Sequence, residues 1–149
     1  MEADTGQARS RVAETDLRTV EALFAAVAAR DLTAILTCYA ADVRIEEAPS
    51  LPYGGVYHGV DGAYEHSLAF WRTWRAFQPA TVDSLRPVMI AGEGRVVVLW
   101  EHEAHDPRSG ASVTNPVVGV YELRAGLITS ARMFHLDTAA LVRFLDHAS

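Results

Sequence analysis

The segment from Glu46 to Gly59 reads Glu-Glu-Ala-Pro-Ser-Leu-Pro-Tyr-Gly-Gly-Val-Tyr-His-Gly. Just before it, Val43, Ile45 and Glu47 alternate as in a short strand, and after it a helical pattern begins. The two prolines and the glycine pair favour tight turns, which set Tyr53 beside the strand end that carries Glu47. We therefore expect a wall of a pocket here, formed by a carboxylate and an aromatic loop.

Two helical patterns precede this segment. The apolar residues of segment 17–27 recur at the spacing of one helix face, and Thr15 or Asp16 is placed to cap that helix. Asp31 is placed to cap a second, shorter helix, which we expect to end before Asp42. The chain is thus predicted to begin with two helices that lead into the short strand.

After the loop the chain changes from helix to strand. A third helix is predicted from Gly59 onward, with Tyr64, Trp71 and Trp74 on its apolar face and Pro79 at its end. Helices followed by hairpins indicate an α+β fold in which helices cover one face of a curved antiparallel sheet. The remaining predicted elements are β-rich segments 80–91, 95–105, 112–124 and 127–136 and a last helix capped by Asp137 or Thr138.

The length and composition fit one globular domain. The chain has 149 residues, of which 50% are hydrophobic and 21% are charged, so it is long enough to bury a core. We expect residues 1–13 to form a flexible N-terminal tail and residues 14–149 to form a single domain.

Charge and cysteine content limit the classes of binding partner and the cellular setting that we expect. The formal net charge is -6 and all 13 basic residues are arginines without a basic stripe, so we expect no nucleic-acid partner. No apolar run is long enough to span a membrane, and no membrane partner is expected. The single Cys38 lies in an apolar helical pattern, which predicts a buried thiol and fits a reducing, cytoplasmic setting.

The order of elements resembles a known superfamily. Two helices, a short strand, a Pro-Tyr-Gly-Gly loop, a third helix and strands that end in Gly126-Leu127-Ile128 and Met133-Phe134-His135-Leu136-Asp137 are similar to the nuclear transport factor 2-like superfamily. The SnoaL-like group within it, which includes polyketide cyclases and limonene-epoxide-hydrolase-like and ketosteroid-isomerase-like proteins, is the best match. The resemblance covers residues from about Asp16 to Leu145. It implies a cone-shaped sheet wrapped around the helices, an apolar cavity, and a homodimer contact on the outer face of the sheet.

The resemblance also implies which strand residues face the cavity. Side chains alternate along a strand, and alignment with the epoxide-hydrolase-like relatives places His102 and His135 inward, together with Glu47 from the short strand. We take these three as the candidate catalytic residues. The candidate substrate-binding residues are Ile45, Tyr53, Trp71, Trp74, Trp100, Asn115, Val117 and Met133.

This set is typical of acid/base chemistry. Burial in an apolar cavity is expected to raise the pKa of Glu47, which makes it a general base near neutral pH, with His102 or His135 as acid or hydrogen-bond donor. The leading hypothesis is a cofactor-independent cyclase or isomerase for an apolar polyketide-like or polycyclic small molecule. Two alternatives remain open: epoxide opening, and a domain that binds an apolar metabolite without catalysis.

The catalytic residues of the relatives are replaced by other residues in this sequence, which bears on the reaction. The Asp-Arg-Asp set of the epoxide hydrolases falls on His102, Trp100 and Met133, and the key acid of the SnoaL-type cyclases also falls on Met133. Their specific mechanisms are therefore not expected. His102 and His105 point to opposite faces of a strand, so no metal site is expected, and no nucleotide or other cofactor motif occurs.

Overall fold

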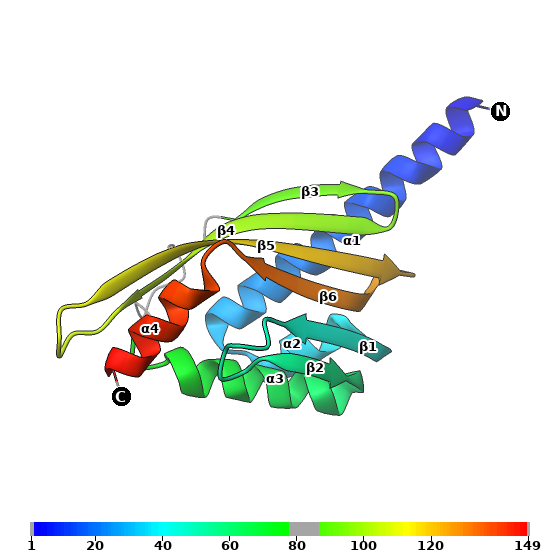
Figure 1. The fold of residues 1–149 in the computed structure, drawn as a ribbon. Coiled ribbons are helices and arrows are strands. Elements are labelled where there is room, and N and C mark those ends of the chain that lie inside the picture. Colours follow the sequence, from blue (N-terminus) through cyan, green and yellow to red (C-terminus); the bar gives the residue numbers. More distant parts are fainter. Residues whose placement is uncertain (1, 78–86, 149) are drawn as a thin grey trace.

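The computed structural model describes residues 2–77 and 87–148 (Figure 1). The first half of the chain holds two helices, two strands and a third helix, and strands fill most of the second half. Pro79 and the first part of the β-rich segment expected at 80–91 lie outside the described residues. The elements are α1 (Glu2–Ala29), α2 (Leu32–Thr37), β1 (Tyr39–Glu47), β2 (Gly55–His58), α3 (Gly59–Trp74), β3 (Val88–Gly92), β4 (Arg95–His105), β5 (Ser112–Arg124), β6 (Leu127–His135) and α4 (Thr138–Ala148).

The six strands form one curved sheet in the order β2-β1-β6-β5-β4-β3. Strands β3 to β6 are consecutive antiparallel neighbours, as expected, and the α+β class is confirmed. Two details differ from the curved antiparallel sheet that was expected. Strand β1 pairs with β6 in parallel, and the sheet does not close, since β2 and β3 are its edges. The parallel pair arises because β1 joins the meander beside its last strand.

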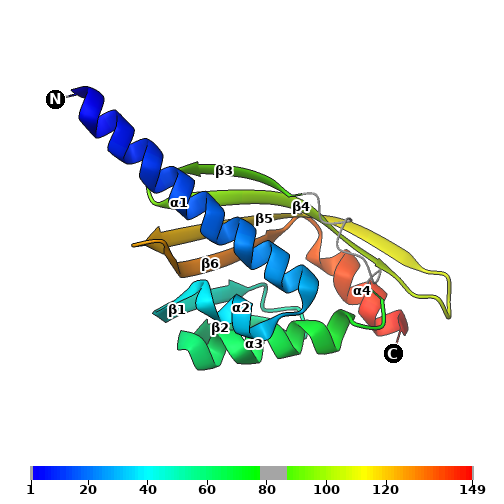
Figure 2. The same ribbon diagram turned by 180° about the vertical axis from the view of Figure 1, so that it is seen from behind.

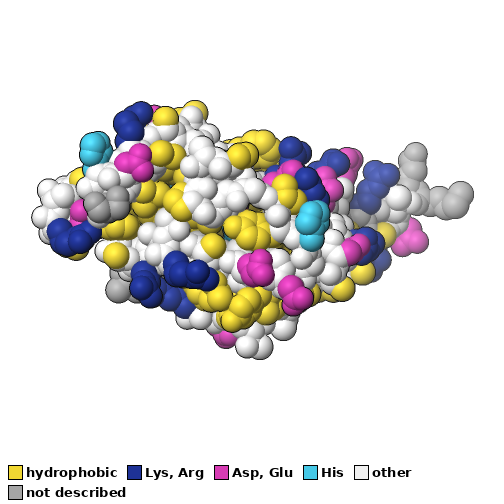
Figure 3. Space-filling view, turned by 60° about the horizontal axis from the view of Figure 1, so that its bottom comes forward, with side chains coloured by type: hydrophobic (Ala, Val, Ile, Leu, Met, Phe, Trp, Pro, Cys, Tyr) yellow, Lys and Arg dark blue, Asp and Glu magenta, His cyan; other side chains and the backbone are white. Residues whose placement is uncertain are grey.

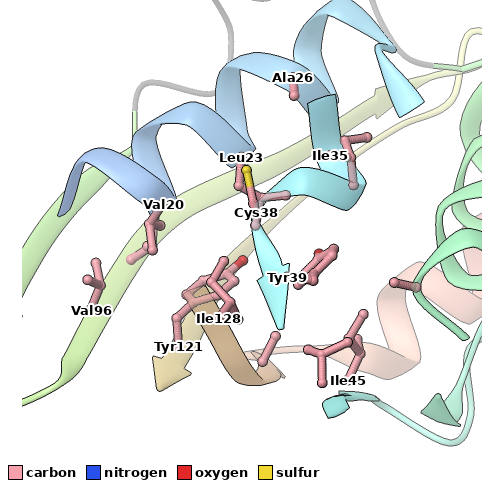
Figure 4. Packing of buried hydrophobic residues seen from close by; sticks show 14 residues of the cluster. Val20, Leu23, Ala26, Ile35, Cys38, Tyr39, Ile45, Val96, Tyr121 and Ile128 are labelled. Carbon is pink, nitrogen blue, oxygen red and sulfur yellow. The ribbon is translucent and has the colours of Figure 1, made fainter. Parts of the chain in front are cut away.

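Helix α1 lies diagonally across one face of the sheet, while α2 and α3 cover the β1 and β2 end (Figure 2). Val20 and Leu23 of α1 are buried against Val96 of β4 and Ile128 of β6. Figure 4 shows these side chains together with Tyr121 and Cys38. Cys38 is only 6% exposed, so the expected burial of this thiol is confirmed. The helical spacing of segment 17–27 thus produces the main core contact.

Helix boundaries differ from the expectation at the N-terminus. Helix α1 starts at Glu2, so the expected tail is helical from Glu2 onward, and Thr15 and Asp16 lie inside the helix instead of capping it. The side chains of residues 3–12 are exposed, which explains why no apolar pattern predicted this extension. Asp31 caps α2 as predicted, since the Ala34 backbone N–H donates to its carboxylate at 3.0 Å.

The loop that follows Glu47 is held by its own backbone. The Leu51 N–H donates to Ala48 O at 3.1 Å, and the Gly54 N–H donates to Leu51 O at 2.8 Å. The Tyr57 hydroxyl donates to the Tyr53 carbonyl oxygen at 2.9 Å, and Tyr53 itself is 1% exposed. The end of this loop also forms strand β2, which pairs with β1 and which the sequence pattern did not predict. The loop therefore buries Tyr53 beside the end of β1.

Substituting Gly54 with alanine is expected to destabilise the fold by about 1–3 kcal/mol. An added Cβ would overlap the carbonyl oxygen of Ala48 and lie 2.9 Å from that of Leu51, and backbone atoms cannot rotate away. The measurement is the free energy of unfolding in urea. Gly92→Ala is the matched control, because nothing lies within 4 Å of a Cβ added there. Equal stability of the two variants would contradict the prediction.

Candidate active site

A cavity of about 170 Å³ lies between the helix-covered face of the sheet and helices α1, α2 and α3. Its exposed lining residues, Arg30 at the end of α1 and Glu101 and Glu103 of β4, mark where it reaches the surface. The predicted residues that line it are Ile45, Glu47, Tyr53, Trp71, Trp100, His102, Val117, Met133 and His135. The inward alternation expected along β1, β4, β5 and β6 agrees with their burial patterns.

Glu47 is the central polar group of this cavity. It ends β1, is 8% exposed, and lies between two histidines. Its Oε1 is 2.9 Å from Nε2 of His66 on α3, and its Oε2 is 3.5 Å from Nε2 of His135 at the end of β6. One carboxylate is thus positioned by a strand, a helix and the last strand of the sheet.

The two histidines outweigh the effect of burial on Glu47. Burial by itself pushes the pKa of this carboxyl group up, but His135 and His66 favour the charged form and hold the pKa below its ordinary value. The contact with His66 is the shorter of the two, at 2.9 Å against 3.5 Å for His135. The expectation of a raised pKa was therefore wrong, because sequence reasoning included burial without the His66 partner. Glu47 is a carboxylate at neutral pH.

His102 is packed among aromatic rings. It is 4% exposed, and its ring centroid lies 4.3 Å from that of Trp74 and 6.1 Å from that of Phe70. Burial and the neighbouring His135 lower the pKa of His102 to about 4, against a smaller raising effect of Glu47. This imidazole is therefore neutral at pH 7.

Asn115 lies behind His135. It is fully buried on β5, opposite His102 in the strand register. Its Nδ2 is 3.1 Å from Nδ1 of His135, and its Oδ1 accepts a 2.8 Å hydrogen bond from the Asp137 backbone N–H. Asn115 does not line the cavity, so its predicted role as a substrate contact is not supported by its position. Both hydrogen-bonding atoms of its amide are directed at protein groups.

Several buried polar atoms of the cavity make no hydrogen bond, although Glu47 Oε2 and His135 Nε2 face each other at 3.5 Å. Among residues 2–77 and 87–148, no hydrogen bond satisfies Glu47 Oε2, the Nε2 atoms of His102 and His135, or the Tyr53 hydroxyl. Each such atom costs about 1–3 kcal/mol when it stays unpaired. Burial also raises the pKa of Tyr53, which keeps its hydroxyl protonated. Groups of this kind are expected where a protein binds a polar ligand atom.

The sequence missed one wall of the cavity. His66, Ser67 and Phe70 line it from α3, because the buried face of that helix is rotated relative to the predicted one and leaves Tyr64 44% exposed. The spacing of Ala63, His66, Ser67 and Phe70 could have shown this face. Trp74 does not line the cavity and packs instead beneath His102, against Phe144 of α4. The other unpredicted lining residues include Phe24, Ile35, Tyr39 and Tyr121.

Two further features concern metals and membranes. Within the described part of the chain, no group of three or more His, Cys, Asp or Glu residues is arranged to hold a metal ion. No helix there is both long enough and apolar enough to cross a membrane.

The sequence matches the family model of the SnoaL-like domain over residues 20–131, which run from α1 into β6. No match to a curated protein was found.

Solved structures of the same shape are numerous, and three illustrate the range. A nuclear transport factor 2-like protein of unknown function from Burkholderia pseudomallei is 26% identical, with a TM-score of 0.74, and the match covers 88% of this chain and 97% of that one. TerC, co-crystallised with polyporic acid, is 24% identical with a TM-score of 0.74 and coverage of 89% and 98%. A proposed polyketide cyclase from Xanthomonas campestris is 20% identical with a TM-score of 0.68 and coverage of 93% and 99%. The latter two likenesses concern the fold alone.

Proposed function

This chain belongs to the SnoaL-like domain family, and on that premise we propose that it is a cofactor-independent acid/base enzyme for a small, apolar, polyketide-like carbonyl compound. The observation that carries the proposal is the set of unpartnered polar atoms of Glu47, His102, His135 and Tyr53 around one cavity. A carboxylate beside hydrogen-bond donors, inside an aromatic wall, is suited to moving a proton at a carbon next to a carbonyl group. Isomerisation and ring closure are the reactions this serves.

In the proposed reaction, Glu47 Oε2 takes the proton. The electron pair of the broken C–H bond forms a carbon–carbon double bond, and the carbonyl π electrons move onto the substrate oxygen. That oxygen accepts hydrogen bonds from His135 and from His102 or Tyr53. Return of the proton from Glu47 to another carbon completes an isomerisation. Attack of the enolate carbon on a second carbonyl, whose oxygen then takes the proton, closes a ring.

The cavity limits the size of the substrate. Its volume of about 170 Å³ is close to the ~150 Å³ of a protein cavity that binds benzene. We therefore expect the cavity to enclose about one ring of the substrate. This restricts the polycyclic compounds expected from the sequence to those that need only one ring inside the cavity. TerC is co-crystallised with polyporic acid and the Xanthomonas campestris protein is a proposed polyketide cyclase, which agrees with a small-molecule ligand in this cavity.

Proton exchange tests this function without knowledge of the natural substrate. The protein is incubated in D₂O with cyclohex-2-enone, 1-tetralone and cyclohexane-1,3-dione, and the α-proton signals are followed by NMR. We expect deuterium to enter at least one ketone faster than in buffer alone. Saturable binding without exchange would favour the non-catalytic binding domain instead.

We also propose a cytoplasmic homodimer that forms through the outer face of the sheet. One apolar row crosses four strands in register, from Val88 through Leu99 and Val118 to Phe134. Val88 is 61% exposed and Phe134 is 48% exposed, so this row faces outward. On the face shown in Figure 3, by contrast, arginines lie in separate groups among acidic and apolar side chains. The buried, unpaired Cys38 agrees with a cytoplasmic location.

Leu99→Glu is expected to convert the dimer into a monomer, because it places a charge in the middle of the apolar row. Light scattering coupled to size-exclusion chromatography measures the mass in solution. Val12→Glu is the matched control, since Val12 is 54% exposed on α1, the helix that lies across the opposite face of the sheet. A wild-type monomer, or a dimer that survives Leu99→Glu, would rule out this contact.

A further inference from the structure

We infer that Asn115 is a positioning residue that fixes the proton of His135 on Nε2, the nitrogen that faces Glu47. The inference deepens the proposed function, on which its kinetic part rests, but the position of the proton follows from hydrogen bonds alone. It assigns Asn115 a role different from the substrate contact expected from sequence.

The first step is the orientation of the Asn115 amide. One end of this side chain lies 2.8 Å from the backbone nitrogen of Asp137. A backbone N–H can only donate, so the amide atom that faces it must be the oxygen. The Asp137 N–H thereby fixes the direction of the amide, and Nδ2 is left to face His135 at 3.1 Å.

The second step concerns the imidazole. Nδ2 of an amide can only donate, so Nδ1 of His135 must accept and carries no proton. A neutral imidazole has one protonated nitrogen, which is then Nε2. That nitrogen lies 3.5 Å from Glu47 Oε2 and has no hydrogen-bond partner among the residues the structure describes. Its N–H is therefore ready for a substrate oxygen bound next to the base.

The neighbourhood of Asn115 is rigid. The residue is fully buried, and the chain beyond His135 is tied on both sides of Asp137. The Leu136 N–H donates to Pro116 O at 3.0 Å, and the Asp137 carboxylate accepts the Ala140 N–H at the start of α4. The amide thus links β5, the end of β6 and the cap of α4, so its direction does not depend on a mobile side chain.

Asn115→Asp tests the inference, because a carboxylate can accept from both Asp137 N–H and His135 Nδ1–H. Two-dimensional ¹H–¹⁵N NMR of the imidazole rings reports which nitrogen is protonated, and His135→Gln assigns the signals. In the wild type we expect Nε2 to be protonated and Nδ1 to be unprotonated, and in Asn115→Asp we expect the proton to move from Nε2 to Nδ1. A protonated Nδ1 in the neutral wild-type ring would overturn the inference even if the variant failed to fold, as would an unchanged ring in a folded variant.

The kinetic consequence is separable. Asn115→Asp is expected to lower kcat for ketone exchange by about 10²-fold with little change in KM, because only the hydrogen bond to the developing oxyanion is lost. An equal loss confined to KM would contradict a positioning role. If the wild type exchanges no ketone while the NMR finds the expected tautomer, the proposed reaction fails and the proton placement stands.

Discussion

Replacing Glu47 with glutamine is expected to lower the rate of ketone exchange by about 10²-fold or more. Glutamine has nearly the same shape but cannot accept the substrate proton. In the wild type, His66 and His135 keep this group a carboxylate at neutral pH, so its removal deletes the base itself. The measurement is kcat for deuterium entry in D₂O, followed by NMR at saturating ketone.

Glu46→Gln is the matched control. Glu46 is the neighbouring residue on β1, but it faces the outer side of the sheet, where it pairs with Arg44 and Arg132. It should exchange ketone at the wild-type rate. If Glu47→Gln retained full activity, Glu47 would not be the base, and retained ketone affinity without wild-type exchange would favour a binding domain.

The second large effect concerns stability in acid. The pKa of His102 is lowered to about 4 from an ordinary 6.5. Between pH 4 and pH 6.5 the unfolded chain therefore binds a proton at this residue that the folded chain does not bind. His102 therefore does not lower the free energy of unfolding above pH 6.5. As the pH falls below 6.5 it lowers this free energy increasingly, and the loss levels off below about pH 4. Two and a half pH units correspond to about 3 kcal/mol at most. His102→Phe should remove this loss, because phenylalanine keeps the ring contacts without titrating.

The measurement is the free energy of unfolding in urea from pH 7.5 to pH 4 for both proteins. Above pH 7 their difference reports packing alone, so the change of that difference with pH isolates the titration. We expect the free energy of unfolding of His102→Phe, relative to that of the wild type, to increase steadily as the pH falls below 6.5. Parallel profiles would show that His102 is not held neutral by burial.

Much of the fold follows from local patterns. The helical spacing in segment 17–27, the alternation along β4 and the cap at Asp31 were all predicted correctly, because each depends on residues close in the chain. The parallel pairing of β1 with β6 and the strand β2 were not predicted. Strand order is set by contacts between distant segments, and no local period records it. The exposed first turns of α1 carry no apolar signal at all.

The lining of the candidate site was predicted in outline, but its electrostatics were not. Glu47, His102 and His135 were placed on the cavity side because strand alternation groups side chains by face and the resemblance to the superfamily indicated which face points inward. His66 was missed because the predicted buried face of α3 was rotated slightly from the observed one. Without His66 beside Glu47, the direction of the pKa shift of Glu47 was also predicted wrongly. The role of Asn115 depends on a hydrogen bond from Asp137, which lies in a different element.

The parallel pairing of β1 with β6 also determines when this site can exist during synthesis. Glu47 leaves the ribosome well before His135, and the pair of strands that joins them closes the segment between β1 and β6 into one loop. Until β6 emerges, β1 has an unpaired edge and Glu47 lacks one of its two histidines. A nascent chain stalled before β6 would therefore have an open edge strand, prone to pair with other chains, and a cavity without the wall that β6 supplies.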